Sequence, residues 1–413
     1  MAKHFWPSGD FGSDPYFKKD VKYQYRDRTL NFRVSQELFS SQDIDVGTKR
    51  LLKTLTDEGF ENYQKVLDFG CGYGPIAIAL KSACPSSEIH GVDKDALALD
   101  YANQNAQINN ISDIKIYPSL GYDNVLDDDF DLIVSNIPGK VGNRVLSHIL
   151  KDARFHLKPQ GRVAIVVIDA IGNYVTEVLS DPGIKILFRK RWPGHLVFHY
   201  QFQSSTPSLT ESGSKSFAAG IYARSENVVP FENHRLSIKT TYNLPEFDTL
   251  SYDTELLLGR LKTVMGRRIE RAIIFNPGQG YIPVALTKLT QVREISLIDR
   301  DLQALKVSRV NLIDNGYPSN RIRLSHQVGI SVERSLPADF ISGILPEKDN
   351  PAVHAMLVRQ SAARLAKEGM IILASSSTTI TRVAAKINSE KFLNIVDRQK
   401  SKGRSVIILK TRA

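Results

Sequence analysis

The sequence predicts an α/β protein made of two tandem doubly wound domains, the second a degenerate copy of the first. Three observations predict this fold class. Apolar strand-like runs alternate with helical segments, which is typical of a parallel sheet covered by helices. A glycine-rich turn within residues 66–80, VLDFGCGYGPIAIAL, joins one such strand to a helix. A related pattern returns in the second half of the chain, which indicates an internal repeat.

The first 27 residues are polar and aromatic with little periodicity, and we interpret residues 1–27 as an N-terminal arm. A strand is expected from Arg28, because RTLNFRVSQELF alternates apolar and polar residues. The segment Asp45–Thr48 (DVGT) is expected to cap the next helix, whose apolar residues Leu51, Leu52 and Leu55 share one face.

The turn after the first core strand contains the alternating glycines Gly70, Gly72 and Gly74, and Asp68 precedes them. Glycine lets the backbone bend sharply and lets a ligand approach with no Cβ in the way. The helix behind the turn offers free N–H groups. Such a loop is typical of nucleotide binding, although its spacing is G-x-G-x-G rather than the G-x-G-x-x-G of dinucleotide-binding proteins. The alternative is a glycine-rich turn in an unrelated α/β fold.

The second core strand, residues 88–93 (EIHGVD), ends in Asp93. This acid is placed to accept hydrogen bonds from the two hydroxyls of a ribose. The other elements expected in the first domain are a helix at 96–108, strands at 114–117 and 130–135, a helix at about 145–157, a strand at 162–168 and a hairpin of 184–189 with 196–202.

A Ser/Gly-rich segment, residues 204–228, is interpreted as a linker. It separates a first domain, residues 28–203, from a second domain, residues 229–413. Asp299 lies 206 residues after Asp93 (299 − 93). The same offset pairs many other positions of the two halves, and further along the chain the offset becomes 208. The second half is therefore predicted to be a diverged copy of the first.

The two copies differ where chemistry is expected. Asp68 is replaced by Ile274, and Gly70 is replaced by Asn276. An apolar side chain cannot make the polar contacts of a carboxylate, so we expect the second domain to have kept the fold and lost catalysis. Asp299 leaves residual ligand binding open, but an Asp that caps the next turn explains this residue equally well.

Composition describes an ordinary globular protein, with 42% hydrophobic and 24% charged residues in a chain of 413. No apolar run approaches the roughly 20 residues of a membrane span, and MAKHFWPSGDFGSD lacks the apolar core of a signal peptide. We therefore expect a cytoplasmic protein without membrane association. Cys71 and Cys84 are too few for a zinc site, and the nine histidines show no metal-ligand spacing, so no metal is expected. A net charge of +10 favours a polyanionic partner.

The fourth core strand ends in a second motif, DLIVSNIPGK (residues 131–140), at the point where a doubly wound sheet places its ligand. An exocyclic amine on a nucleic-acid base is a poor nucleophile, because its lone pair is delocalised into the ring. The side-chain oxygen of Asn136 and the carbonyl of Ile137 can accept its two hydrogens and localise that pair. Attack on a methyl group then needs mainly positioning. The alternative is that Asn136 only ends a strand.

Together with the segment FSSQDIDVGT (residues 39–48), these two motifs make the first domain resemble the "methyltransferase small" family. These are Rossmann-like class I methyltransferases that use S-adenosylmethionine (SAM). The resemblance covers residues 28–200 and, more weakly, 234–413. Its best-known members methylate the exocyclic amine of guanine in ribosomal RNA, and the resemblance implies this activity, SAM as cofactor and ribosomal RNA as partner. In tandem members of the family the N-terminal copy is the degenerate one, whereas here it is the C-terminal copy.

The resemblance also implies roles for particular residues. Those expected in catalysis are Asn136, Ile137 and Pro138, and those expected to bind the cofactor are Thr48, Asp68, Gly70, Cys71, Gly72, Gly74, Asp93 and Ser119. A loop serine with no ligand is an equally good explanation of Ser119.

The family pattern is Asn-Pro-Pro followed by Phe or Tyr, so Ile137 and Gly139 depart from it. The aromatic ring that would stack on the target base is missing, and such stacking is worth about 1–3 kcal/mol per base. Trp192 and Tyr122 are the candidates to replace it.

Two other functions remain open at this point. The missing aromatic suggests a methyltransferase that acts on a small molecule or a protein, and the double departure at Ile137 and Gly139 suggests a non-catalytic module that binds RNA or a partner. The basic residues Arg50 and Arg189–Arg191 could contact phosphates, although solvated charge explains any one of them. The sequence does not fix the oligomeric state, and a monomer is compatible with it.

Overall fold

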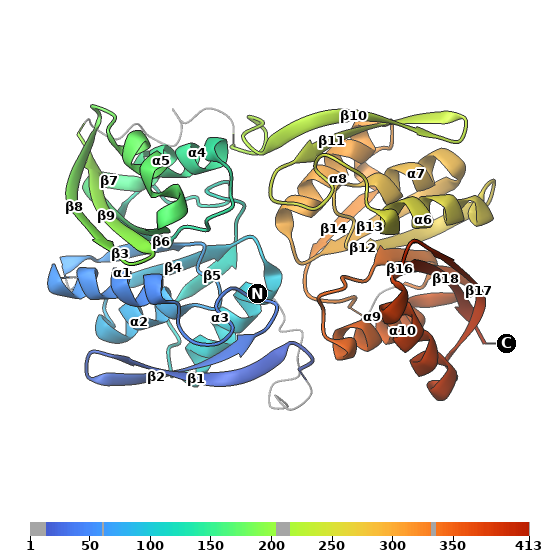
Figure 1. Ribbon diagram of the computed structural model, residues 1–413, viewed down its shortest axis with the longest axis horizontal. Coiled ribbons are helices and arrows are strands. Elements are labelled where there is room, and N and C mark those ends of the chain that lie inside the picture. The colour runs from blue at the N-terminus through green and yellow to red at the C-terminus, as the bar shows by residue number, and fades with distance from the viewer. Residues whose placement is uncertain (1–13, 60–61, 204–214, 332–335, 413) are drawn as a thin grey trace. The chain divides into compact units, whose positions relative to one another are not determined.

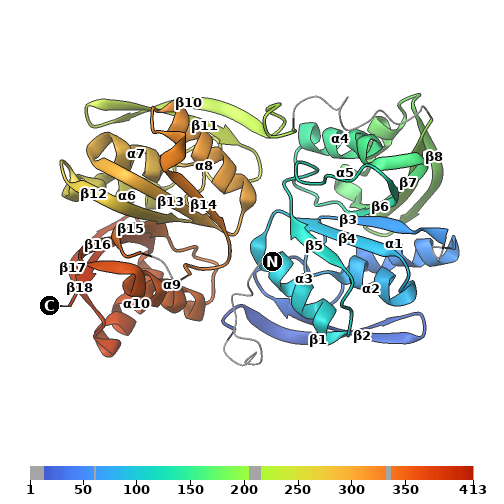
Figure 2. The ribbon, with the colours of Figure 1, turned by 180° about the vertical axis from the view of Figure 1, so that it is seen from behind.

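The computed structural model describes residues 14–59, 62–203, 215–331 and 336–412. The chain divides into two compact units, Phe17–Tyr222 and Ala223–Ala413, and Asp14–Tyr16 is grouped with the second. Each unit is a seven-stranded, mostly parallel sheet with helices on both faces (Figures 1 and 2). The predicted fold class, two tandem doubly wound α/β domains, is therefore confirmed.

The strand order of the first unit shows at which edge of the sheet a ligand-binding crevice is expected. The sheet order is β5-β4-β3-β6-β7-β9-β8, and β9 alone runs antiparallel to its neighbours β7 and β8. Strand order therefore reverses between β3 and β6, and a crevice opens at the carboxyl ends of strands at such a point. The elements are β1 (Phe17–Tyr25), β2 (Arg28–Ser35), α1 (Val46–Asp57), β3 (Lys65–Phe69), α2 (Pro75–Ala83), β4 (Glu88–Asp93), α3 (Ala96–Ile108), β5 (Lys115–Pro118), β6 (Phe130–Asn136), α4 (Asn143–Asp152), η3 (Ala153–His156), β7 (Leu157–Ile168), α5 (Asp169–Leu179), β8 (Ile184–Trp192) and β9 (His195–Phe202).

Helices cover both faces of this sheet. Helices α1, α2 and α3 lie on one face, α4 and α5 lie on the other, and the β1–β2 hairpin runs along α2 and α3 (Figures 1 and 2). The central strands are apolar on both faces, as in Val66 and Leu67 of β3 and Ile133 and Val134 of β6, all buried. Burial on both faces explains why these strands read as continuous apolar runs in the sequence.

The expected arm differs from the structure at its C-terminal end. Residues Phe17–Tyr25 form strand β1, which pairs antiparallel with β2, and Val21 and Tyr25 are buried. Alternate residues of FKKDVKYQY face inward, so a period of two was present but was hidden by its many charged residues. Residues 1–13 of the expected arm lie outside the described residues.

The expected linker also differs. Residues 215–222 pack on the first unit, where the Ser216 hydroxyl donates a hydrogen bond to the Asp123 carboxylate, and β10 already begins at Ala223. The part at residues 204–214 lies outside the described residues. Within the first unit, helix α5 was not expected, and β7 begins at Leu157 rather than at Arg162 because it includes a bulge with Gln160 at a positive φ of 65°.

The second unit repeats this architecture. Its sheet order, β14-β13-β12-β15-β16-β18-β17, matches the first sheet strand for strand. Its elements are β10 (Ala223–Phe231), β11 (His234–Thr241), α6 (Tyr252–Arg260), η5 (Leu261–Val264), β12 (Arg268–Phe275), α7 (Tyr281–Leu289), β13 (Gln291–Asp299), α8 (Leu302–Asp314), η6 (Ser319–Arg321), β14 (Ile322–His326), β15 (Ala338–Ile344), α9 (Pro351–Arg364), β16 (Leu365–Ser376), α10 (Ser377–Glu390), β17 (Leu393–Ser401) and β18 (Arg404–Thr411). The internal repeat predicted from the sequence therefore has a structural counterpart. Among the described residues of both units, helices are too short or too polar to cross a bilayer.

Candidate active site

The glycine-rich turn connects β3 to α2 and is anchored to the neighbouring strand. The backbone N–H groups of Gly70 and Cys71 both donate to the carbonyl of Val92 in β4, each at 2.9 Å. Gly70 and Gly72 have positive φ angles of 73° and 55°. A Cβ built on either glycine would meet no atom within 4 Å. These two glycines therefore permit the left-handed backbone and leave open space beside the loop.

Gly74 has a different role. It is the N-cap of α2, with φ at 89°. A Cβ at this position would lie 2.9 Å from Cδ1 of Ile78 and 3.3 Å from Cβ of Ala102 in α3. The glycine is therefore required for the close packing of α2 against α3, and it contributes to the loop by ending the turn.

Asp68 lies at the base of the loop and is completely buried. Its Oδ2 accepts a hydrogen bond from the N–H of Ala77 in the first turn of α2, at 2.9 Å. Its Oδ1 is buried and has no hydrogen-bond partner in the described part of the chain. Burial, opposed by the bond from Ala77 and reinforced by the nearby charge of Asp93, raises the pKa of Asp68 to about 7. A buried oxygen without a protein partner is uncommon, and this one can accept a hydrogen bond from a bound molecule.

Asp93 joins the second strand to the loop. Its Oδ2 accepts from the N–H of Gly72 and its Oδ1 accepts from the N–H of Asp95, both at 3.0 Å. Burial, with the charge of Asp95 next in importance, raises the pKa of Asp93 to about 6. Each carboxylate oxygen has lone pairs for a further donor. The half-buried carboxylate can therefore still receive two hydroxyl groups, as expected for a ribose.

Asn136 ends β6 and contacts the N-terminus of α1. Its side-chain nitrogen donates to Oδ2 of Asp45 at 2.9 Å and to Oγ1 of Thr48 at 3.0 Å. Within the segment expected to cap α1, Asp45 is the N-cap, and its Oδ2 also accepts from the N–H of Thr48 at 3.2 Å. The structure thus brings together two expected site residues, Thr48 and Asn136, and adds Asp45. In the described residues no hydrogen bond reaches the Oδ1 of Asn136.

The residues after Asn136 differ in exposure. Ile137 is buried, and its N–H donates to the carbonyl of Val166 at 3.0 Å, whereas Pro138 is exposed. A Cβ built on Gly139 would lie 2.4 Å from Cδ1 of Ile168, which is 39% exposed at the start of α5. A side chain at position 139 would therefore require the Ile168 side chain to move, and in this structure Ile168 offers its own apolar surface at this place.

Two expected cofactor residues use their side chains for the loop itself. The Cys71 thiol is buried, and burial raises its pKa well above the usual value, so the thiol stays protonated. The Ser119 hydroxyl donates to the carbonyl of Gly121 at 2.7 Å and accepts from the N–H of Asn124 at 3.1 Å. These bonds favour the loop-serine explanation of Ser119. The backbone N–H of Ser119 donates to the carbonyl of Asp93, which fixes this loop to the end of β4.

One of the two replacement aromatics proposed from the sequence is excluded. Tyr122 is buried, its ring centroid lies 4.4 Å from that of Phe69 and 4.7 Å from that of His156, and its hydroxyl donates to the carbonyl of Ile149. A ring packed in this way has no free face for a base. Its position in the sequence, two residues after Leu120 in a loop, gave no sign that it belongs to the core.

Trp192 remains a candidate. It ends β8 in a hairpin whose other strand begins at His195, and a Cβ built on Gly47 would lie 2.8 Å from the His195 ring. The hairpin therefore lies against the start of α1, close to the residues that hold Asn136. The guanidinium of Arg50 and the ammonium of Lys190 lie 5.8 and 4.8 Å from the Trp192 ring centroid. An aromatic ring beside two cations is suited to contact a base and its phosphates.

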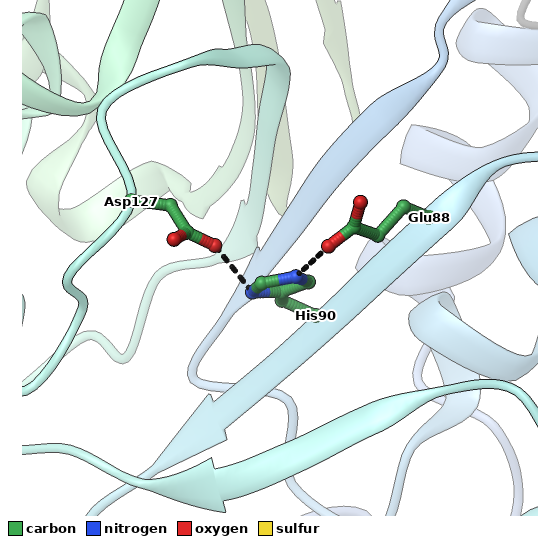
Figure 3. Close-up of side chains that lie close together, drawn as sticks. All are labelled: Glu88, His90 and Asp127. Carbon is green, nitrogen blue, oxygen red and sulfur yellow. Dashed lines mark hydrogen bonds and ion pairs between the residues drawn. The ribbon is translucent and has the colours of Figure 1, made fainter.

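A second polar cluster lies elsewhere in the first unit. The ring of His90 in β4 is placed between the carboxylates of Glu88 and Asp127 (Figure 3). Its Nε2 is 2.8 Å from Oε1 of Glu88, and its Nδ1 is 3.5 Å from Oδ2 of Asp127. Donor atoms of the three residues lie within 4.8 Å of one another, so a metal ion has to be considered.

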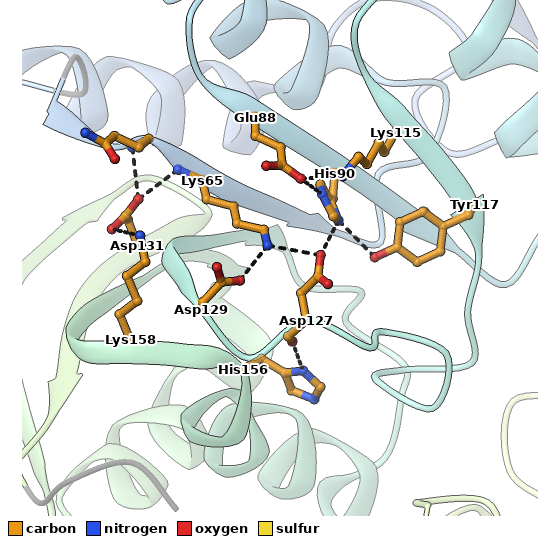
Figure 4. Close-up of polar contacts among 11 residues, drawn as sticks. Lys65, Glu88, His90, Lys115, Tyr117, Asp127, Asp129, Asp131, His156 and Lys158 are labelled. Carbon is orange, nitrogen blue, oxygen red and sulfur yellow. Dashed lines mark hydrogen bonds and ion pairs between the residues drawn. The ribbon is translucent and has the colours of Figure 1, made fainter. Parts of the chain in front are cut away.

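Both carboxylates of this cluster are already paired with lysines. Glu88 forms an ion pair with Lys115, and Asp127 forms one with Lys65 at 3.2 Å (Figure 4). Glu88 and Lys65 are the first residues of β4 and β3, so the cluster lies at the amino ends of the strands, at the edge opposite to the glycine-rich turn. We interpret it as an ion-pair network that joins the strand ends.

The second unit lacks the equivalent site chemistry. Ile274 is completely buried in the core, and the side chain of Asn276, with φ at 48°, donates to the carbonyl of Ile344 at 3.0 Å. This side chain links the ends of β12 and β15, where the first unit has Gly70 and an open space. Asp299 accepts from the N–H of Asp301 at 2.8 Å, so it caps its own turn.

Comparisons with known proteins agree with the geometry of the first unit. The model of the methyltransferase small domain family matches residues 29–180. The chain is 32% identical over 168 residues to the uncharacterized protein YbxB of Bacillus subtilis, and the alignment covers 40% of this chain and 82% of that protein. It is 34% identical over 160 residues to ribosomal RNA small subunit methyltransferase C of Haemophilus influenzae, across 37% of this chain and 47% of that protein. The chain thus spans about half the length of this second relative.

A solved structure matches both units. It is the 16S rRNA N2 G1207 methyltransferase (RsmC) of T. thermophilus in complex with AdoMet and guanosine, with a TM-score of 0.69. The match covers 95% of this chain and 98% of that one at 15% sequence identity, and at this identity it shows that the fold is shared.

Proposed function

This chain belongs to the methyltransferase small domain family, and we propose that its first unit transfers a methyl group from SAM to an exocyclic amine of guanine in ribosomal RNA. The observation that carries this proposal is the pattern of hydrogen bonds made by the side-chain amide of Asn136. Both known contacts of its amide nitrogen are to protein oxygens, which leaves the side-chain oxygen to accept from a substrate. The residue ends β6, next to the place where the strand order reverses.

The residues around the glycine-rich turn fit SAM. The loop leaves open space beside Gly70 and Gly72, Asp93 presents a carboxylate with free lone pairs, and Asp68 carries a buried oxygen without a partner among the described residues. We assign the loop backbone from Gly70 to Gly74 to the cofactor, Asp93 to its ribose hydroxyls, and Thr48 to its edge. When bound, SAM supplies a methyl group activated by a positively charged sulfonium, so the protein need not provide a nucleophile of its own.

The proposed task of the chain is to hold the amine. The Oδ1 of Asn136 and the carbonyl of Ile137 accept the two amine hydrogens, so that the nitrogen lone pair is localised and directed away from them. Orientation of this kind can lower a reaction barrier by several kcal/mol. One of the two hydrogens leaves as a proton to water once the nitrogen has gained its methyl group. Ile168 provides an apolar surface where the family pattern has an aromatic ring.

The substrate class rests on the relatives. One relative is a ribosomal RNA small subunit methyltransferase, and its name gives ribosomal RNA as its substrate. The solved structure with the same two-unit fold is a complex with AdoMet and guanosine. The basic surroundings of Trp192 and the net charge of +10 support a polyanionic substrate. A ribosomal substrate would place the activity in the cytoplasm.

The proposal is tested by incubating the purified protein with methyl-labelled SAM and an extract from cells that lack it, then separating RNA, protein and small molecules. We expect label in ribosomal RNA, and nucleoside digestion should yield guanosine methylated on its exocyclic amine. Label confined to protein or small molecules would contradict the proposal and favour a different acceptor. Binding of SAM without transfer to any fraction would favour the non-catalytic module instead.

A further inference from the structure

We propose that Asp45 is a positioning residue that fixes which way the side-chain amide of Asn136 faces. This inference rests on the proposed function, because it assigns a cause to the orientation that the reaction requires. The sequence predicted Asp45 only as part of a segment that caps a helix. The structure adds a contact between its Oδ2 and the nitrogen of Asn136, at 2.9 Å.

The argument begins with the symmetry of an amide. The oxygen and nitrogen of an Asn side chain have similar size, so packing alone distinguishes the two orientations poorly. A carboxylate accepts hydrogen bonds and cannot donate them. If the Asn136 amide turned over, its oxygen would face an oxygen of Asp45 with no hydrogen between them. The carboxylate therefore selects the orientation in which the nitrogen faces Asp45 and the oxygen faces away.

Thr48 supports this selection without being able to impose it. Its hydroxyl lies 3.0 Å from the nitrogen of Asn136, but a hydroxyl can donate as well as accept. Thr48 would therefore satisfy either orientation of the amide, whereas Asp45 satisfies one. Contact with a carboxylate also polarises the amide, which makes its free oxygen a stronger acceptor for an amine hydrogen.

The local fold makes room for this contact. Asp45 precedes the first residue of α1, and its Oδ2 is kept in place by the N–H of Thr48 at 3.2 Å. A Cβ at Gly47 would come within 2.8 Å of the same oxygen. Glycine at this position therefore lets one carboxylate oxygen cap the helix and receive Asn136 together.

The second unit provides an internal comparison. Ser251 occupies the position of Asp45 and caps α6 by accepting from the N–H of Thr254 at 3.2 Å. Ile344 occupies the position of Asn136. A serine is thus sufficient to cap this helix where no amide has to be held, and the carboxylate is present where the amide is present. Thr254 instead donates to Glu246 at 2.6 Å.

This comparison suggests the test. Asp45→Ser keeps a residue that caps the same helix in the second unit but is too short to reach Asn136. Asp45→Asn keeps a cap whose oxygen, held in place by the N–H of Thr48, faces Asn136 and can accept from it. For methyl transfer to ribosomal RNA we expect Asp45→Ser to lower kcat at least about tenfold, with KM for RNA and Kd for SAM within about twofold of wild type. Asp45→Asn should retain most of the activity. Wild-type kcat in Asp45→Ser, or an equal loss in both variants, would overturn the proposal.

A second measurement separates this inference from the proposed function. In nitrogen-15 NMR spectra, the side-chain amide signals of Asn136, identified by their absence from Asn136→Ala, should shift in Asp45→Ser and show loss of a hydrogen bond. They should stay close to wild type in Asp45→Asn. Unchanged signals in Asp45→Ser would overturn the positioning role. If the signals shift as expected but wild-type protein methylates no RNA, the proposed function fails and the control of the amide by Asp45 stands.

Discussion

The carboxylate of Asp93 accepts a hydrogen bond from the backbone N–H of Gly72 at 3.0 Å. This bond ties the end of β4 to the glycine-rich turn. The equivalent glycine of the second unit, Gly278, has nearly the same φ, 56° against 55°, and a Cβ on either would meet nothing within 4 Å. The two glycines therefore have equal backbone requirements, and they differ in the chemistry that surrounds them.

The first prediction uses this pair as a matched control. Alanine at a left-handed position costs about 1–2 kcal/mol, so Gly72→Ala and Gly278→Ala should destabilise the protein to a similar degree. Only Gly72→Ala should weaken SAM binding, by at least about fivefold, because its new Cβ enters the space we assign to the cofactor. Calorimetric titration and thermal unfolding measure the two effects. Weakening by Gly278→Ala alone would place the cofactor in the second unit.

The second prediction concerns the buried carboxyl group of Asp68. Its pKa of about 7 in the folded protein exceeds the ordinary value near 3.8. Between these values the folded state binds more protons than the unfolded state, so stability falls as the pH rises through this window. Asp68→Asn is neutral at every pH and escapes this loss. The free energy of unfolding of Asp68→Asn relative to wild type should therefore increase from pH 4 to pH 7 and then level off.

Urea unfolding of both proteins at several pH values measures this difference. Asp93 is present in both proteins, so its own raised pKa cancels in the comparison to first order. If the difference in the free energy of unfolding stays constant with pH, or shrinks as the pH rises, the raised pKa of Asp68 is contradicted.

The third prediction links the same carboxyl groups to the cofactor. SAM carries a positive sulfonium, so it should bind best when Asp68 and Asp93 are ionised. With pKa values of about 7 and about 6, the Kd for SAM should rise as the pH falls from 8 towards 5. Asp68→Asn should bind SAM more weakly at pH 8 and should show a smaller dependence on pH. A Kd that is independent of pH in wild type would contradict this account.

The fourth prediction distinguishes the two aromatic residues considered for base stacking. Trp192→Ala should raise KM for RNA at least about fivefold, as expected for a loss of about 1–3 kcal/mol of stacking, and should leave Kd for SAM unchanged. Tyr122→Ala should instead lower the free energy of unfolding by about 3–5 kcal/mol, because it removes a ring from the core. RNA kinetics and urea unfolding of both variants provide the comparison. Normal RNA kinetics in Trp192→Ala would exclude this residue from the substrate site.

Local sequence patterns were sufficient to predict most of the site-bearing elements. The strand at Glu88–Asp93 and the helix at Ala96–Ile108 have the predicted bounds, and an acid marks the boundary in each case: Asp93 ends the strand and Asp95 caps the helix. The role of Asp45 as a cap follows from similarly local chemistry. Its contact with Asn136 does not, since the two residues are 91 positions apart and only the packing of α1 beside β6 brings them together.

The remaining errors have related causes. Tyr122 looked available because its neighbours in sequence belong to a loop, but its ring is buried between Phe69 and His156. Nothing in the sequence indicated that Ile168 lies beside Gly139, because this contact depends on the pairing of β7 with β6. Both cases depend on tertiary packing, which residue type and spacing along one strand cannot specify.

The central claim is that the free oxygen of Asn136 orients the amine for methyl transfer, and Asn136→Ala tests it most directly. The measurement is the rate of label transfer from methyl-labelled SAM to ribosomal RNA, together with Kd for SAM, in wild type and variant. The account predicts a Kd within about twofold of wild type and a rate at least about tenfold lower, because the lost interaction is with the acceptor. An unchanged rate would contradict the role of Asn136 and, with it, the proposed mechanism.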